Sequence, residues 1–287
     1  MNGIGGSPPI HAPSVPRPSL SSAQSDRRFT FTSRDSSMTL GSRTLLRRFF
    51  SETPLGSGSV WLAGDEAQHL LKILRAREGD EVLVFDGRGG EWVARVAKRE
   101  RNRAELELLE HHDVERELSC PLHLGVALPK GDRQKWLVEK LVELGVSSIT
   151  PLVTGRGVAV PSSGALERLR RGVIEASKQC GRNRLMEIRP PLEWSTFCHQ
   201  IPEGHQALVA HPSRPGVLNL LPADLFQRGL RPTIVAVGPE GGFTEEELSL
   251  VQTSHWEWIS LGPRILRVET ACLALATICS ALARELD

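Results

Sequence analysis

The sequence contains no tyrosine, and aromatic residues make up only 5% of its 287 positions. Proteins that hold single-stranded nucleic acid by base stacking present several aromatic side chains, so a surface of that kind is not expected. No apolar run reaches the roughly 18 residues of a membrane-spanning helix, and we expect no membrane partner. The net charge of +1 gives no overall attraction to polyanions, so any nucleic-acid surface must be local.

The cysteines are few and scattered. None of the five forms a C-x-x-C pair; they are Cys120, Cys180, Cys198, Cys272 and Cys279. An odd number without metal-ligand spacing is typical of reduced thiols in an intracellular protein. We therefore predict no metal site and a cytoplasmic location.

Residues 1–46 differ in composition from the rest of the chain. They are rich in Ser, Pro and Arg, poor in acidic residues, and without a sustained apolar period. This composition is typical of a disordered extension, with Met38 as an alternative start. It is also typical of an organelle transit peptide, which would place the protein in a stroma or matrix. Both interpretations stay open.

Short alternating runs over residues 47–117 predict a small β-barrel. A helix is expected at 65–74, where Asp65 and Gln68 give a D-x-x-Q capping signature. The expected strands lie at 59–64, in a hairpin at 81–98 around a glycine-rich turn, and at 103–110.

Strands and helices alternate over residues 118–287, which predicts a mostly parallel sheet with helices on both faces. Gly145 is placed to end one helix, and Thr244 with Glu247 forms a capping box for another. The expected strands are 122–128, 147–153, 206–212, 233–239 and 258–262, and the other expected helices are 133–146, 165–181 and 269–287.

Two glycine–proline bends follow predicted strands of this half, "GPEGG" at 238–242 and "LGPRILR" at 261–267. Ligands of open α/β sheets bind at the carboxyl ends of strands. The first bend lacks the lysine and hydroxyl of a P-loop and the spacing of a dinucleotide fingerprint. A tight connection without a ligand is the alternative. Two such bends after neighbouring strand ends favour a site in which main-chain groups enclose a flat heterocycle.

Four stretches in unbroken order carry a family resemblance: "ALPKGDRQKWLVEKLVELGVSSITPLV", "EASKQCGRNR", "GPEGGFTEEEL" and "LGPRILRVETA". Together they resemble the RsmE family of SPOUT methyltransferases. "RRFF" with "GDEAQHLLKILRAREGDEVLVFDG" resembles the family's PUA-like barrel. The chain departs from the family at Gly155-Arg156, where Glu-Arg is usual.

The resemblance implies an α/β fold: a SPOUT-type knotted, mostly parallel sheet domain at 118–287 with a carboxyl-terminal trefoil knot, preceded by a PUA-like β-barrel RNA-binding domain at 47–117. It also implies a homodimer that uses S-adenosyl-L-methionine (SAM) to methylate N3 of a specific uridine in 16S rRNA of the small ribosomal subunit. The alternatives are a SPOUT methyltransferase with another RNA target and a non-catalytic RNA-binding ribosome-assembly factor.

The resemblance also implies a set of cofactor-binding residues at three strand ends. They are His211, Pro212, Gly238, Glu240, Gly241, Leu261, Gly262, Ile265, Leu266 and Arg267.

Methylation at uracil N3 requires loss of its proton, so a base or a cation that stabilises the uracil anion is needed. Arg267 and Arg182 are the candidate cations, and Glu175 and Glu240 the candidate bases. A structural ion pair is the alternative for each.

Basic residues are the candidates for contacts to RNA phosphates. In the α/β half, the alternatives are a polar turn after the first strand and a solvated helix face. The candidates are Arg47, Arg48, Lys72, Arg75, Lys130, Arg133, Arg168, Arg171 and Lys178.

Overall fold

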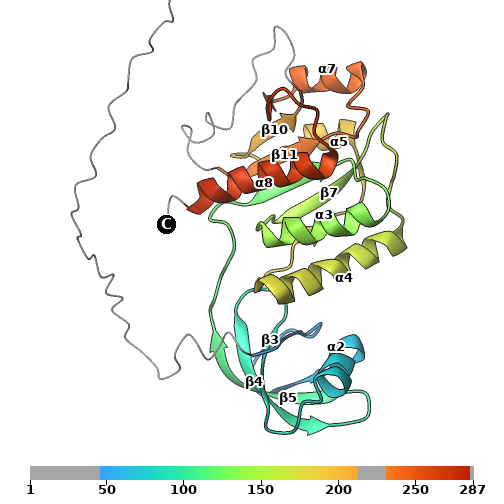
Figure 1. Cartoon of the computed structure of the whole chain (residues 1–287). Helices are drawn as coiled ribbons and strands as arrows, with labels where there is room; N and C mark the ends of the chain where they lie inside the picture. Colours follow the sequence, from blue (N-terminus) through green and yellow to red (C-terminus); the bar gives the residue numbers. More distant parts are fainter. Residues whose placement is uncertain (1–45, 213–230, 285–287) are drawn as a thin grey trace, which may run out of the picture. The chain divides into compact units, whose positions relative to one another are not determined.

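The computed structural model describes residues 46–212 and 231–284. These residues form two β-sheets, one in each half of the chain (Figure 1). The predicted amino-terminal extension lies outside these residues, except for its last position. The predicted knot also depends on a chain path through 213–230, outside the described residues, and stays a prediction. No helix in the described part is long and apolar enough to cross a membrane.

The first sheet confirms the barrel strands predicted from alternating apolar positions. Its order is β1-β3-β4-β5-β2, and every pairing is antiparallel except β1 with β3. Phe49, Leu70 and Leu106 are fully buried in its core. The strands are β1 (Arg48–Phe50), β2 (Ser59–Leu62), β3 (Glu81–Phe85), β4 (Glu91–Arg99) and β5 (Ala104–His112).

The helix between β2 and β3 departs from the prediction in two ways. It begins as α2 (Gly64–Gln68) with Ala63 as N-cap and no side-chain cap, so the predicted capping by Asp65 is wrong. Gly64 has a φ of 58°, which lets the chain turn from β2 into the helix one residue early and places Asp65 inside the first turn. The helix continues as a π-helix, η1 (His69–Ile73).

The second sheet is parallel in every pairing, as predicted for the second half. Its order is β12-β10-β11-β6-β7-β8, and β9 also pairs with β7. The strands are β6 (Leu122–Val126), β7 (Ser148–Val153), β8 (Glu187–Ile188), β9 (Leu192–Glu193), β10 (Gln206–Ala210), β11 (Thr233–Val237) and β12 (Trp256–Ile259).

Helices cover both faces of this sheet (Figure 1). On β11, Val235 packs in one core cluster and Ile234 in another, so the strand is buried on both sides. One cluster includes α3 (Asp132–Glu143), α4 (Ser163–Cys180) and α8 (Val268–Arg284), and the other includes α5 (Trp194–His199) and α7 (Glu245–Thr253).

Helix ends in this half follow their sequence signals. Gly145 adopts a φ of 81° directly after α3. The Thr244 side chain accepts from the Glu247 N–H while Glu247 bonds the Thr244 N–H, which completes the predicted capping box of α7. The capping signals that contain glycine or a hydroxyl therefore predicted the element boundaries correctly.

Candidate functional site

A cavity of about 260 Å³ lies at the carboxyl edge of the parallel sheet. Its walls come from the ends of three strands and from the start of α8. Strand β10 lies between β11 and β12, and its Ala210 is in register with both Val237 and Ile259. The sequence predicted that the two glycine–proline bends follow neighbouring strands. In the structure they follow β11 and β12, which lie on either side of β10.

The bend at 238–242 folds back onto the ring of Phe243. A Cβ at Gly238 would lie 2.8 Å from that ring, so only glycine fits without a shift. The Gly242 N–H donates to the Pro239 carbonyl at 2.8 Å and closes the turn. The bend thus presents mostly main chain to the cavity.

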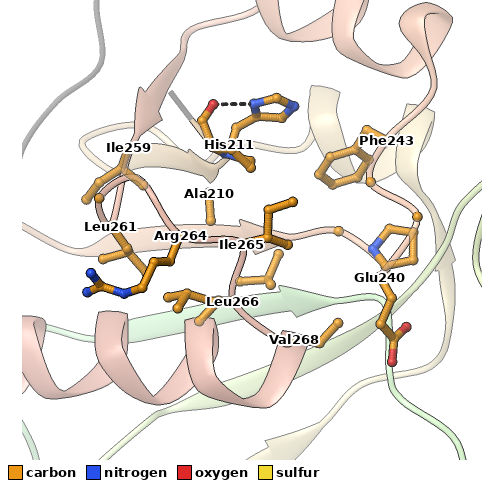
Figure 2. Close-up of a pocket in the computed structure, with 18 residues that line it drawn as sticks. Ala210, His211, Glu240, Phe243, Ile259, Leu261, Arg264, Ile265, Leu266 and Val268 are labelled. Atoms are coloured by element: carbon orange, nitrogen blue, oxygen red, sulfur yellow. Dashed lines mark hydrogen bonds between the residues drawn. The ribbon is translucent and has the colours of Figure 1, made fainter. Parts of the chain in front are cut away.

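The second bend supplies aliphatic side chains. Leu261, Ile265 and Leu266 line the cavity from this segment (Figure 2). Gly262 has a φ of 101°, a conformation that side chains rarely adopt, which explains the glycine there. The Ile265 side chain is 85% exposed, so it forms an open wall.

A third segment, the loop after β7, holds the first bend in place. Arg156 Nη1 donates to the carbonyls of Gly241 at 2.9 Å and Phe243 at 3.3 Å. The neighbouring Gly155 N–H donates to Glu247 Oε1 at 2.8 Å. A Cβ at Gly155 would lie 3.0 Å from the Thr244 methyl group. The residue that departs from the family pattern therefore allows a close approach between these loops.

Nine of the ten predicted cofactor-binding residues line this one cavity, and Arg267 does not. Arg267 is exposed, and its carbonyl accepts from the Ala271 N–H as α8 begins. Arg267 lies directly before α8, and its role as a cofactor contact stays a prediction. The prediction missed several lining residues, including Phe243 and Arg264. "GGF" and "PRI" lie inside the quoted motifs and could have indicated both.

The Glu240 carboxylate points away from the other labelled side chains of the cavity (Figure 2). It pairs with Arg133 at 3.3 Å, and Arg133 also reaches Glu269 at 3.5 Å. Glu269 is buried, and its Oε2 has no hydrogen-bond partner among the described residues. Arg133, predicted as a phosphate contact, is therefore engaged by two carboxylates and joins the bend to α8.

Arg182 is a structural residue, which corrects its prediction as a catalytic cation. Its guanidinium is buried and donates to Glu117, with an Nε–Oε1 distance of 3.0 Å. It also donates to the carbonyls of Val142 and Val146, both at 3.0 Å. It does not line the cavity, and all of its described contacts are with protein groups.

Two of the candidate residues on α4, Glu175 and Lys178, form ion pairs with protein groups. The half-buried Lys178 pairs with Glu66 of the barrel at 2.6 Å and with Glu175 at 3.1 Å. Burial alone would lower the pKa of Lys178, but the hydrogen bond and charge of Glu66 raise it. The structure thus contradicts Lys178 as a phosphate contact. Glu175 does not line the cavity either, and its role as a base stays a prediction.

Arg48 joins the two halves of the chain. It is therefore not available for the RNA phosphate contact that the sequence predicted. It pairs with Glu91 of β4, and its Nη2 donates to Asn183 Oδ1 at 2.6 Å. Burial alone would raise the pKa of Glu91, but the hydrogen bond and charge of Arg48, with Arg116, lower it.

The remaining candidates for RNA contacts stay available on the surface. All are exposed: Arg47, Lys72, Arg75, Lys130, Arg168 and Arg171.

A parallel sheet with a cavity between loops at three strand ends, preceded by a small barrel, agrees with an RNA methyltransferase that carries a PUA domain. Family models agree, since residues 116–280 match an RNA methyltransferase domain and 62–109 match an RNA methyltransferase PUA domain. The chain belongs to the family of ribosomal RNA small subunit methyltransferase E.

Individual relatives show the extent of the similarity. The Synechocystis ribosomal RNA small subunit methyltransferase E is 37% identical over 225 residues, 77% of this chain and 72% of the relative. The Neisseria gonorrhoeae enzyme of that name, solved bound to S-adenosyl methionine, is 32% identical with a TM-score of 0.74, covering 83% of this chain and 98% of that one. Lpg2936 from Legionella pneumophila, solved with the cofactor SAM, is 28% identical with a TM-score of 0.74, covering 82% and 97%.

Proposed function

We propose that this protein transfers a methyl group from SAM to N3 of one uridine in 16S rRNA of the small ribosomal subunit. The observation that carries the proposal is the meeting of three strand ends at one cavity, with nine of the predicted cofactor-binding residues in its walls. Relatives of this chain that were solved with SAM support the choice of cofactor.

The cavity fits such a cofactor by its chemistry. The aliphatic side chains of Leu261, Ile265 and Leu266 suit a flat base, and the main chain at 238–242 offers groups for its polar edge. The fit of Gly238 against Phe243 lets the backbone itself form the wall. When bound, SAM supplies an electrophilic methyl group.

The residues of the chain have to align and deprotonate the acceptor. We assign anion stabilisation to the exposed cations beside the cavity, Arg264 in its wall and Arg267 just after Leu266. A guanidinium can donate to a uracil carbonyl as charge builds there. Glu240 lines the cavity and is the candidate acceptor for the N3 proton, a role that requires its carboxylate to leave Arg133 and turn toward the acceptor.

A second copy of the chain completes the proposal. Large exposed apolar side chains lie on segments that follow β6, β7 and β12: Trp136, Val158, Val160 and Ile265. Exposed apolar groups favour coverage by another protein surface. We expect Trp136→Glu to convert a dimer to a monomer in analytical ultracentrifugation. A wild-type monomer at micromolar concentration would contradict this part of the proposal.

Primer extension tests the activity. Ribosomal RNA from a strain that lacks the activity is incubated with SAM and the purified protein. A methyl group at N3 blocks base pairing and is expected to stop the polymerase at one uridine, whereas a ribose methyl would let it pass. Calorimetry with SAM accompanies the assay. Binding of SAM without a stop would favour another RNA target, and no binding at millimolar SAM would overturn the enzymatic function.

A further inference from the structure

The segment Lys72–Arg77 in the barrel projects an apolar side chain among cations. The buried face of this helix is formed by Ala67, Leu70 and Leu71, and Ile73 falls outside it. Its side chain is 72% exposed. Lys72, Arg75 and Arg77 are exposed around it in the sequence.

The backbone of this segment is strained at one of its charged residues, Arg75. Arg75 has a φ of 53° and is the one non-glycine residue with positive φ in the described part of the chain. The helices α3 and α4 end on glycines in this conformation, Gly145 and Gly181. An arginine in this conformation is strained relative to a relaxed backbone, because its Cβ crowds the following carbonyl oxygen. Such strain points to a function for the side chain.

The helix before Arg75 is also irregular. The Leu74 N–H donates to the His69 carbonyl at 3.0 Å, and the Ala76 N–H reaches back to the Leu70 carbonyl at 3.1 Å. The first bond spans one residue more than an α-helical bond, and the second spans two residues more. Single π turns of this kind are frequent at functional sites. Here the wide turn places Ile73 and Arg75 on either side of half-buried Leu74.

The cations of this segment differ from several others in the barrel that are held by carboxylates. Arg48, Arg95, Lys98 and Arg103 each pair with a carboxylate. Within residues 46–212 and 231–284, no such ion pair involves the side chain of Lys72, Arg75 or Arg77. Unpaired cations favour a polyanion as the partner of this surface.

We propose that Lys72–Arg77 is an RNA-binding tip, in which Ile73 inserts against a base step and the flanking cations hold the phosphates. Apolar wedges between bases, fixed by neighbouring cations, are a known mode of nucleic-acid binding. The barrel has little else for this purpose, because Phe49 and Phe85 are buried and Trp61 is covered by Arg103, whose Cζ lies 4.4 Å from its ring centroid. The tip rests on the proposed function, since it names how that RNA is held.

Two variants of the full chain test the tip on purified small ribosomal subunits from a strain that lacks the activity. Ile73→Ser is expected to raise the KM for subunits about tenfold, because the burial of one aliphatic side chain is lost. Arg75→Gly is expected to raise the melting temperature and to weaken subunit binding. Partial unfolding would lower both the melting temperature and the affinity for subunits, so it cannot explain a higher melting temperature with weaker binding. Leu109→Ser, on β5 of the same barrel, is the control, and both KM and affinity should stay at the wild-type values.

Unchanged subunit affinity and KM in both tip variants would overturn the proposal. Loss of dimerisation with an unchanged KM would assign the tip to a protein contact and would also overturn it. Cosedimentation with subunits and calorimetry with SAM run in parallel. If the wild-type protein binds subunits but transfers no methyl group, the proposed function fails. The cosedimentation of the tip variants still shows whether Lys72–Arg77 contributes to RNA binding.

Discussion

At the scale of single residues, the guanidinium of Arg156 has the clearest consequence for the cavity. It fixes two carbonyls of the bend at 238–243 from outside the cavity. We predict that Arg156→Ala raises the Kd for SAM about tenfold, since each charge-assisted hydrogen bond contributes about 1.5–3 kcal/mol and the bend can relax in part. Arg156→Lys should recover little, because an ammonium cannot donate in the same fork geometry.

Calorimetry measures this effect, with Arg95→Ala as the matched control. Arg95 is similarly exposed but pairs with Glu81 in the barrel. A wild-type Kd for Arg156→Ala would show that the bend keeps its conformation without this residue.

A second prediction at this scale concerns the cation in the cavity wall. Because Arg264 is exposed and lines the cavity, we expect Arg264→Gln to lower kcat at least tenfold while the Kd for SAM changes less than twofold. Stabilisation of a developing anion appears in the chemical step and not in cofactor binding. Single-turnover methyl transfer separates the two. A changed Kd with a normal kcat would make Arg264 a cofactor contact.

Residue roles were the part least predictable from the sequence. Arg48, Lys178 and Arg182 carry the same charge as true surface cations. Their partners lie far along the chain, at Glu91, Glu66 and Glu117, and no local pattern reveals such pairs. The cofactor loops were different, because glycine and proline at strand ends report directly on backbone shape.

At the scale of elements, α7 is stabilised by the capping box that follows the first bend. We predict that Thr244→Ala lowers the free energy of unfolding by about 1 kcal/mol, because it removes the side-chain acceptor for the Glu247 N–H. The change should also weaken SAM binding slightly, since Glu247 bonds both Thr244 and Gly155.

Urea unfolding measures the loss of stability. Thr253→Ala, at the other end of α7, is the control, because its hydroxyl only donates back to the Leu250 carbonyl within the helix. Equal effects of both variants would show that the capping box has no special role.

Long elements with a clear period were predictable, and short or irregular ones were not. The strands β6, β7, β10 and β11 carry apolar runs that the sequence shows plainly. The two-residue strands β8 and β9 were not predicted, since two residues cannot display a period. The π turn in η1 preserves the same apolar spacing as an α-helix at this length, which is why the pattern alone predicted one regular helix.

At the scale of the whole molecule, two groups at the junction between the barrel and the methyltransferase half have pKa values that are shifted in opposite directions. Glu91 pairs within the barrel with Arg48, which also donates to Asn183 of the other half, and Lys178 pairs across the junction with Glu66. The lowered pKa of Glu91 means that its stabilisation is complete above the ordinary carboxyl pKa and is lost as the pH falls through the lowered value. The raised pKa of Lys178 means that its stabilisation is complete below the ordinary lysine pKa and is lost as the pH rises through the raised value. The junction is therefore most stable between about pH 5 and pH 10.

This arrangement predicts the behaviour of Glu91→Gln. Arg48, whose side chain is only 12% exposed, would keep its charge without a counterion, and we expect a loss of about 3 kcal/mol at pH 7. The variant should also lose less stability than the wild type between pH 6 and pH 3, because the titrating carboxylate is gone. Thermal unfolding across this range measures both effects.

Glu81→Gln, which removes an exposed partner of Arg95 in the same barrel, should reproduce neither. If Glu91→Gln keeps the acid sensitivity of the wild type, another carboxylate controls the stability of the junction at low pH.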